Sequence, residues 1–173
     1  MLKPNIEKKL NYQINRELYS SYLYLSMSSY LKGEGLDGYA NWFKVQAEEE
    51  RDHALIIYNY VHLSGGTVVL DAIEAPPATF DGVRDVLKKS AEHEALVTGL
   101  INDIVTLAQK EKDHKTSNYF MWFVDEQVEE EDNAATNLKK FDLMGSDGKG
   151  LYLLDQELAG RVYKVPSPLA TAQ

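Results

Sequence analysis

Four long stretches of the chain repeat apolar residues at three- and four-residue spacing, which is typical of one face of an α-helix. We expect helices over about residues 5–32, 37–63, 79 or 81 to about 110, and 116–143, the second with Asp37 as its N-cap. Glycines follow three of these segments, as they often do at helix ends; the last is Gly145. A shorter fifth helix should end at Gly160, and the tail VPSPLATAQ is expected to be unstructured.

The lengths of the connections predict how these helices are arranged. The first and third connections are short, so each joins an antiparallel pair. The second, roughly residues 65–78, is long. A helix of about 27 residues spans about 40 Å, and about 12 extended residues cover that length. We therefore expect residues 1–161 to form one all-α domain. It is a four-helix bundle with one long crossover and a short fifth helix, and a flexible tail follows at 162–173.

The stripe of each helix that should face the core is apolar towards its ends and polar near its middle. Glu17 and Glu50 are 33 residues apart, and so are Glu94 and Gln127. The two halves also match in a second feature, because Glu50-x-x-His53 corresponds to Gln127-x-x-Glu130. Residues three apart share a helix face. We expect six polar side chains to meet at the middle of the bundle: Glu17, Glu50, His53, Glu94, Gln127 and Glu130.

Four carboxylates in a core cost several kcal/mol each unless their charge is compensated. Two divalent cations would balance all four charges, with the histidine neutral. Oxygen ligands with one imidazole suit iron or manganese; zinc also binds such sites but performs no redox chemistry. The pattern favours a dinuclear carboxylate site. The alternative is a purely structural bundle whose buried carboxyl groups are protonated and hold no metal.

Charge and composition narrow the classes of function. The net charge is −9 and no basic cluster stands out, so we expect no nucleic-acid partner. The chain has no cysteine, which excludes disulfides, thiolate zinc sites and iron–sulfur clusters. No apolar run approaches the roughly 20 residues of a membrane span. The first ten residues, MLKPNIEKKL, lack the apolar core of a signal peptide, so we expect no membrane association and a cytoplasmic location.

These residues resemble the ferritin family, specifically its bacterial non-haem type, from the first helix to about Gly160. The matching segments are NRELYSSYLYLSMS around Glu17, EEERDHA around Glu50, EHE around Glu94, and WFVDEQVEEE around Gln127. The resemblance implies a ferritin-like bundle and a homo-oligomeric shell of 24 subunits with 432 symmetry that stores ferric mineral. It also implies ferroxidase activity, in which two Fe(II) ions together reduce dioxygen.

The resemblance assigns roles to individual residues. Glu17, Glu50 and His53 would hold one iron, and Glu50 would bridge to a second iron held by Glu94 and Glu130. Gln127 would lie beside the second iron as a ligand or hydrogen-bond partner. Tyr24 matches the family's tyrosine beside the centre, which supplies an electron or a hydrogen bond during oxygen reduction. A third iron position is implied at four carboxylates: Glu49, Glu126, Glu129 and Glu130.

The chain departs from other branches of the family at several positions. Arg51 stands where bacterioferritins have a haem-binding methionine, so we expect no haem. Ser117 and Phe120 replace the acidic pair that lines the threefold channel of animal ferritins, so the resemblance leaves the iron route open.

The remaining histidines and Trp122 have no expected role in metal binding. Three histidines, His62, His93 and His114, are expected at the surface or at helix ends, and Trp122 is expected in packing.

A competing function is a di-iron or di-manganese enzyme acting on peroxide or another small substrate. The short chain disfavours it, because no inserted segment is present to form a substrate channel.

Overall fold

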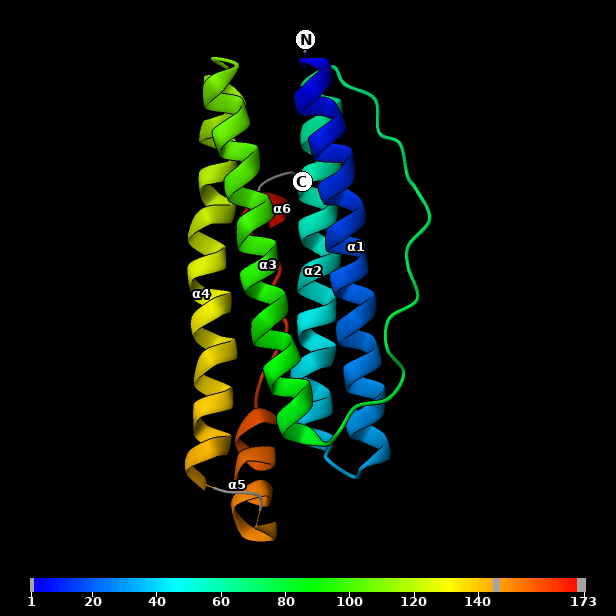
Figure 1. The fold of residues 1–173 in the computed structure, drawn as a ribbon, viewed down its shortest axis with the longest axis vertical. Helices are drawn as coiled ribbons and strands as arrows, with labels where there is room; N and C mark the ends of the chain where they lie inside the picture. Colours follow the sequence, from blue (N-terminus) through cyan, green and yellow to red (C-terminus); the bar gives the residue numbers. More distant parts are fainter. Residues whose placement is uncertain (1, 145–146, 171–173) are drawn as a thin grey trace.

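The computed structural model describes residues 2–144 and 147–170 of the 173-residue chain, and this part is helical without strands (Figure 1). The helices are α1 Pro4–Gly33, α2 Asp37–Leu63, α3 Val83–Lys110, α4 His114–Met144, α5 Gly148–Leu158 and α6 Ser167–Ala170. The expected long helices are confirmed, although α3 begins a few residues later and α4 slightly earlier. Gly145, expected to end the fourth helix, lies outside the described residues. Among the described helices, none combines the length and the apolar character needed to cross a bilayer.

The connections produce the expected arrangement of two antiparallel hairpins, α1–α2 and α3–α4. Residues 64–82 run the length of the bundle beside α1, so α2 and α3 are parallel (Figure 1). Asn11 on α1 ties this crossover down, because its side chain donates to Thr67 O at 2.9 Å and accepts from Val69 N at 2.9 Å. The Asn15 side chain donates to Ala72 O at 3.1 Å one turn further along. Polar side chains of α1 thus satisfy backbone groups of an extended segment that has no sheet partner.

Two helix ends use the same backbone turn with different residues. At the end of α2, Gly65 has a φ of +72° and the N–H of Gly66 donates to Val61 O at 2.9 Å. At the end of α3, Lys112 has a φ of +57° and the N–H of Asp113 donates to Ala108 O at 2.8 Å. Glycine normally occupies this position, because it adopts the left-handed backbone conformation without a steric penalty. The lysine explains why the sequence carries no glycine signal at the end of the third helix.

The start of α2 differs from the expectation that Asp37 caps it. Asp37 lies inside the helix, the N-cap is Leu36, and no local side chain caps this end. The cap comes from α5, where Asp155 Oδ1 accepts from the backbone N–H groups of Gly38 at 2.8 Å and Tyr39 at 3.0 Å. Gly38 permits this approach, since a Cβ there would lie 1.6 Å from the backbone oxygen of Asp155. A contact more than a hundred residues away in sequence therefore replaces the local cap.

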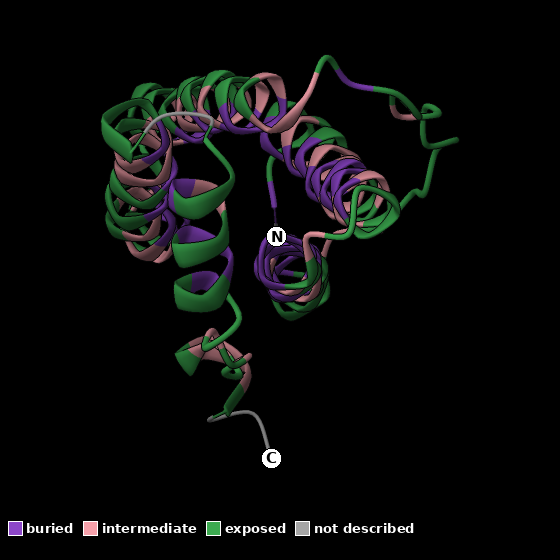
Figure 2. Ribbon diagram, turned by 90° about the horizontal axis from the view of Figure 1, so that it is seen from below, coloured by how far each residue is buried: buried purple, intermediate pink, exposed green. Residues whose placement is uncertain are grey.

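The core consists of two apolar clusters separated by a polar layer, and the buried residues face the inside of the bundle (Figure 2). One cluster surrounds Met27, Phe43 and Leu87 near the α1–α2 turn. The other surrounds Leu10, Ile57 and Ile101 at the opposite end. The layer between them consists of buried polar side chains from all four long helices: Gln13, Glu17, Ser20, Gln46, Glu50, His53, Ser90, Glu94, Gln127 and Glu130. The predicted change from apolar to polar along each stripe thus forms one continuous layer.

The segment after α5 contacts α2 and includes the short helix α6, where the sequence predicts an unstructured tail. The flexibility expected for 162–173 stays a prediction, and residues 171–173 lie outside the described residues. In the first part of the segment, side chains bond to α2: Arg161 donates to the Glu49 carboxylate, and the Tyr163 hydroxyl donates to Asp52. The short helix α6 follows, and its Leu169 packs against the apolar cluster around Ile57. Periodicity gave no sign of this packing because single residues of an extended segment make the contacts. We refer to residues 159–164 as the strap.

Replacement of Asp155 by alanine should destabilise the protein. It leaves the buried N–H groups of Gly38 and Tyr39 without their acceptor, which costs about 1–3 kcal/mol in the free energy of unfolding. Glu157→Ala on the same helix removes only an exposed ion pair with Lys140 and should cost less than about 1 kcal/mol. Denaturant unfolding followed by circular dichroism, at equal protein concentration, measures both. Equal effects would contradict capping by Asp155.

Candidate metal centre

The first hairpin brings three potential ligands together in the polar layer. Glu17 comes from α1, while Glu50 and His53 come from one face of α2, three residues apart. All three are buried, with at most 2% of each residue exposed. Their ligand atoms lie within 4.8 Å of one another, and His53 Nδ1 is 3.6 Å from Glu50 Oε2. The arrangement can hold one cation.

The second hairpin completes a neighbouring group. Glu94 of α3 and Glu130 of α4 have carboxylate oxygens within 4.8 Å of an oxygen of Glu50 and of each other. Glu50 therefore belongs to both groups. A carboxylate has two oxygens and about four lone-pair directions, so it can bridge two cations. The structure brings together the five residues that the resemblance assigns to the pair of irons; that they bind metal stays a prediction.

Glutamine side chains orient the carboxylates by donating to one of their oxygens. Gln13 Nε2 donates to Glu17 Oε1 at 2.8 Å. Gln46 Nε2 donates to Glu50 Oε1 at 3.1 Å and to Glu130 Oε1 at 2.8 Å. Sequence reasoning did not assign these glutamines a role, although each lies in a core stripe four residues before a glutamate. Their position one helical turn away was the available signal.

Several buried atoms of this layer have no hydrogen-bond partner within the described residues. They include Glu17 Oε2, Glu130 Oε2 and His53 Nε2. A buried polar atom without a partner is costly, and such atoms are uncommon in folded proteins. Both carboxylate oxygens bear lone pairs when their groups are ionised, and His53 Nε2 bears one in the neutral tautomer that carries its proton on Nδ1; a cation requires such lone pairs. The donor set therefore fits two metal ions better than it fits a purely structural core.

The electrostatics of the polar layer agree with this fit. Burial, and after it the neighbouring Glu94 carboxylate, raises the pKa of Glu50 well above its usual value. Burial followed by the charge of Glu50 does the same to the pKa of Glu130. Burial lowers the pKa of His53, but the surrounding carboxylates, Glu130 first, outweigh it and raise that pKa. Without metal, the layer retains protons that cations would displace.

Tyr24 and Gln127 both contact Glu94. The Tyr24 hydroxyl donates to Glu94 Oε1. Burial and then the Glu94 charge raise the pKa of Tyr24 well above its usual value, so the phenol keeps its proton. Gln127 Nε2 lies 3.3 Å from the Glu94 backbone oxygen and 3.1 Å from Thr98 Oγ1. In this arrangement Gln127 is a hydrogen-bond partner of Glu94, one of the two roles expected for it.

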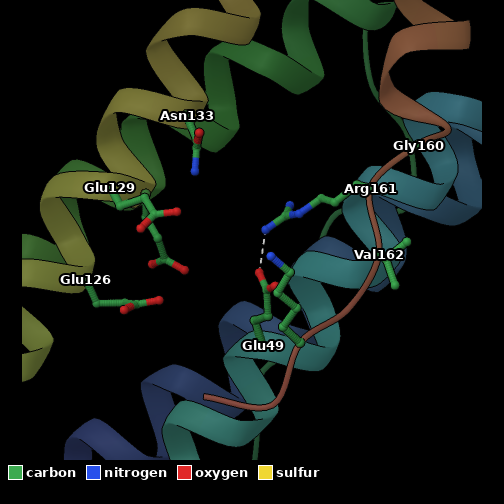
Figure 3. A pocket seen from close by; sticks show the side chains of 9 residues that line it. Glu49, Glu126, Glu129, Asn133, Gly160, Arg161 and Val162 are labelled. Atoms are coloured by element: carbon green, nitrogen blue, oxygen red, sulfur yellow. Dashed lines mark hydrogen bonds and ion pairs between the residues drawn. The ribbon is translucent and has the colours of Figure 1, made fainter. Parts of the chain in front are cut away.

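The residues implied for a third iron position do not all converge. A pocket of about 460 Å³ is lined by four carboxylates, those of Glu49, Glu126, Glu129 and Glu130 (Figure 3). Glu126 and Glu130 lie with His53 in a third group whose ligand atoms are within 4.8 Å. Glu49 instead accepts from Arg161 of the strap, and Glu129 lines the pocket outside the three-residue group. Sequence reasoning missed Arg161, because no periodicity places the strap against α2.

The other histidines divide into exposed and partly buried positions. His62 and His114 are exposed, as expected. His93 is not a surface histidine: its Nε2 lies 2.8 Å from Ser20 Oγ, and burial followed by the charge of Arg16 lowers its pKa to about 4. Trp122 packs edge-on against His53, with ring centroids 5.7 Å apart, which agrees with the packing role expected for it.

The fold and this sequence match known proteins along most of the chain. The Ferritin-like domain family matches residues 7–144. A probable bacterial non-heme ferritin-like protein of Haemophilus influenzae is 40% identical over 158 residues, covering 91% of this chain and 96% of that protein. A bacterial non-heme ferritin of Staphylococcus epidermidis is 37% identical over 163 residues, covering 94% of this chain and 98% of that protein.

Solved structures agree with the sequence matches. The open-pore ferritin of the hyperthermophilic archaeon Archaeoglobus fulgidus superposes with a TM-score of 0.93 and 42% identity, covering 94% of this chain and all of that chain. A form of the same ferritin engineered to be closed has the same TM-score and identity. Sequence and structure thus agree over nearly the whole length, and the chain belongs to the ferritin family.

Proposed function

We propose that the protein is a cytoplasmic iron-storage ferritin that oxidises Fe(II) with dioxygen and deposits ferric mineral inside a shell of 24 subunits. The observation that carries this proposal is Glu50, which belongs to two buried ligand groups at once. The relatives of this chain are named as non-heme ferritins or ferritin-like proteins, which supports iron as the metal. The proposed centre holds two Fe(II) ions per subunit and needs no haem.

The charges and lone pairs of the centre suit a pair of Fe(II) ions as substrate. Glu17, Glu50, Glu94 and Glu130 together supply four negative charges, which two Fe(II) ions neutralise. Two Fe(II) ions each give one electron to dioxygen, which takes up two protons and becomes hydrogen peroxide. A pair of metals makes this two-electron step possible without release of superoxide. Protons displaced from the buried carboxyl groups leave as Fe(II) binds.

The neighbouring groups position the ligands and exclude water. Gln13 donates to Glu17 and Gln46 donates to Glu50, which fixes the orientation of these carboxylates while their remaining lone pairs would be available to Fe(II). The protonated Tyr24 hydroxyl donates to Glu94, so Tyr24 lies close enough to the centre to supply a hydrogen bond or an electron during oxidation of Fe(II). Phe43 stacks on Tyr24 at 5.8 Å and helps to close the centre on that side. The apolar clusters on both sides keep the layer dry, which strengthens each charge interaction.

The outer surface supports an assembly of many subunits. Large apolar side chains on α1 and α2 are at least 36% exposed, among them Tyr12, Tyr22, Leu25, Leu55 and Tyr58. Other exposed apolar side chains lie on α3, α4, α5 and the crossover. Exposed apolar surface of this extent is compatible with burial between subunits. The matched structures are an open-pore ferritin and an engineered closed form of it, which supports a shell of several subunits for this chain.

Aerobic addition of Fe(II) to the metal-free protein tests storage directly. We expect ferric absorbance to rise rapidly and the protein to take up far more than two Fe(II) per chain. Gel filtration should show a large shell, because storage needs an enclosed volume. Uptake that stops at two metal ions on a small oligomer would favour the competing di-iron or di-manganese enzyme, for which peroxide turnover is then the measurement.

His53→Ala and Glu130→Ala should each slow the initial oxidation of Fe(II) by at least about tenfold, since each removes a ligand worth more than about 1.4 kcal/mol. Neither side chain lies on the outer surface, so the size of the assembly should not change. Stopped-flow absorbance measures the fast phase. His62→Ala is the matched control, because His62 is an exposed histidine of the same helix. Fast oxidation that persists in both ligand variants would mean that the centre lies elsewhere.

Zinc should stabilise the metal-free protein more strongly as pH rises. The pKa of Glu50 is raised in the folded state by burial. The stability that its neutral form provides is present below the unfolded pKa, about 4.3, and is lost as pH rises through the folded value. Zn(II) binds the deprotonated form, so the gain in Tm on adding Zn(II) should be larger at about pH 7.5 than at about pH 5.

Two substitutions check this assignment to the buried carboxyl. Glu50→Gln should raise the Tm of the metal-free protein near neutral pH, because it removes a desolvated acid, and should abolish most of the zinc effect. Glu48→Gln, on the partly exposed neighbour, should do neither. A zinc effect that is independent of pH, or unchanged in Glu50→Gln, would contradict binding at this layer.

A further inference from the structure

We propose that Arg161 is a built-in competitor for metal in the pocket between α2 and α4: it occupies the Glu49 carboxylate and so weakens binding of a third Fe(II) beside the two-iron centre. The inference rests on the proposed function, because the same iron-binding layer forms one wall of this pocket. Arg161 belongs to the strap and has no other role in the proposed function.

The Arg161 side chain is fixed by three contacts with α2. Its Nη2 donates to Glu49 Oε2, its Nη1 donates to Trp42 O at 3.3 Å, and its guanidinium carbon lies 4.3 Å from the centre of the Trp42 ring. The Arg161 and Glu49 side chains are 20% and 21% exposed. An ion pair that is largely shielded, charge-assisted and stacked on an aromatic ring is stronger than an open surface pair.

The pocket places this ion pair opposite the remaining carboxylates. Figure 3 shows Arg161 reaching from the strap towards Glu49, with Glu126 and Glu129 facing them from α4. On that side Glu126 lies with Glu130 and His53, close enough to share one ion, and His53 Nε2 is 4.0 Å from Glu126 Oε1. Arg161 occupies Oε2 of Glu49 and adds a positive charge beside it. A cation that used Glu49 as a further ligand would have to displace the guanidinium or share the carboxylate with a like charge, and either costs binding free energy.

The strap does not depend on the Arg161 side chain for its position. The Asn41 side chain donates to the backbone oxygen of Arg161 at 2.9 Å, and the Tyr163 hydroxyl donates to Asp52. Replacing the guanidinium thus leaves both of these anchors in place. Its effect on metal binding can be separated from release of the strap.

Anaerobic titration of the assembled protein with Fe(II), followed by equilibrium dialysis, tests the competition. In Arg161→Gln, the first two Fe(II) per chain should bind as in the wild type. The dissociation constant of the third should fall by about tenfold or more, since a hydrogen bond to a charged group is worth at least that factor. Lys164→Gln is the matched control: Lys164 lines the same pocket, and within the described residues it forms no ion pair. Its substitution should change the third constant by less than about threefold.

Adding Glu49→Gln to Arg161→Gln should remove the gain, because it removes the carboxylate that Arg161 had released. Three results would overturn the proposal. The dissociation constant of the third Fe(II) is unchanged in Arg161→Gln, or it falls equally in Lys164→Gln, or it falls in Arg161→Gln even when Glu49 is also replaced. Should Arg161→Gln fail to assemble, Arg161→Met carries the test, since it keeps an apolar stem over Trp42 but has no charge and no donor for Glu49. An unchanged dissociation constant for the third Fe(II) in that variant also overturns the proposal. A wild type that does not bind the first two Fe(II) would overturn the proposed function itself.

Discussion

The cost of placing four carboxyl groups across the middle of a helical core constrains the rest of this structure. Burial, followed by the charge of neighbouring carboxylates, raises the pKa of Glu50 and Glu130, and Glu17 Oε2 and His53 Nε2 have no hydrogen-bond partner among the described residues. Hydrophobic burial in the two flanking clusters must offset that cost, and each cluster is rich in large aromatic and aliphatic side chains. The layer is stable as part of the fold only because the apolar ends of the same helices pack on both sides of it.

The architecture follows from the need to bring this layer together from distant parts of the chain. Each hairpin delivers a carboxylate from its first helix and a pair of polar groups from its second. The extended crossover beside α1 then sets α3 and α4 in the orientation that aligns the two halves. Because Glu50 is shared by two ligand groups, the halves form one centre rather than two separate sites.

The chain beyond the four long helices has a larger part than its length suggests. Asp155 of α5 caps the start of α2, which is the helix that carries Glu50 and His53. The strap then runs along the same helix, where Arg161 donates to the Glu49 carboxylate and the Tyr163 hydroxyl donates to Asp52. Each of these contacts satisfies a polar group of α2, so the segment that follows α4 links the stability of α2 to the charge of the pocket.

Sequence periodicity determined the four long helices and the residues of the polar layer, because helical phase decides which side chains face a common core, and the connection lengths determined the crossover. Spacing grouped six side chains, and their metal binding stays a prediction: Glu17, Glu50, His53, Glu94, Gln127 and Glu130. Tertiary structure decided the rest. The cap from Asp155, the pairing of Arg161 with Glu49 and the partial burial of His93 depend on single contacts between segments distant in the sequence. No repeat length encodes such contacts, since they arise only once the packed helices bring those segments within hydrogen-bonding distance.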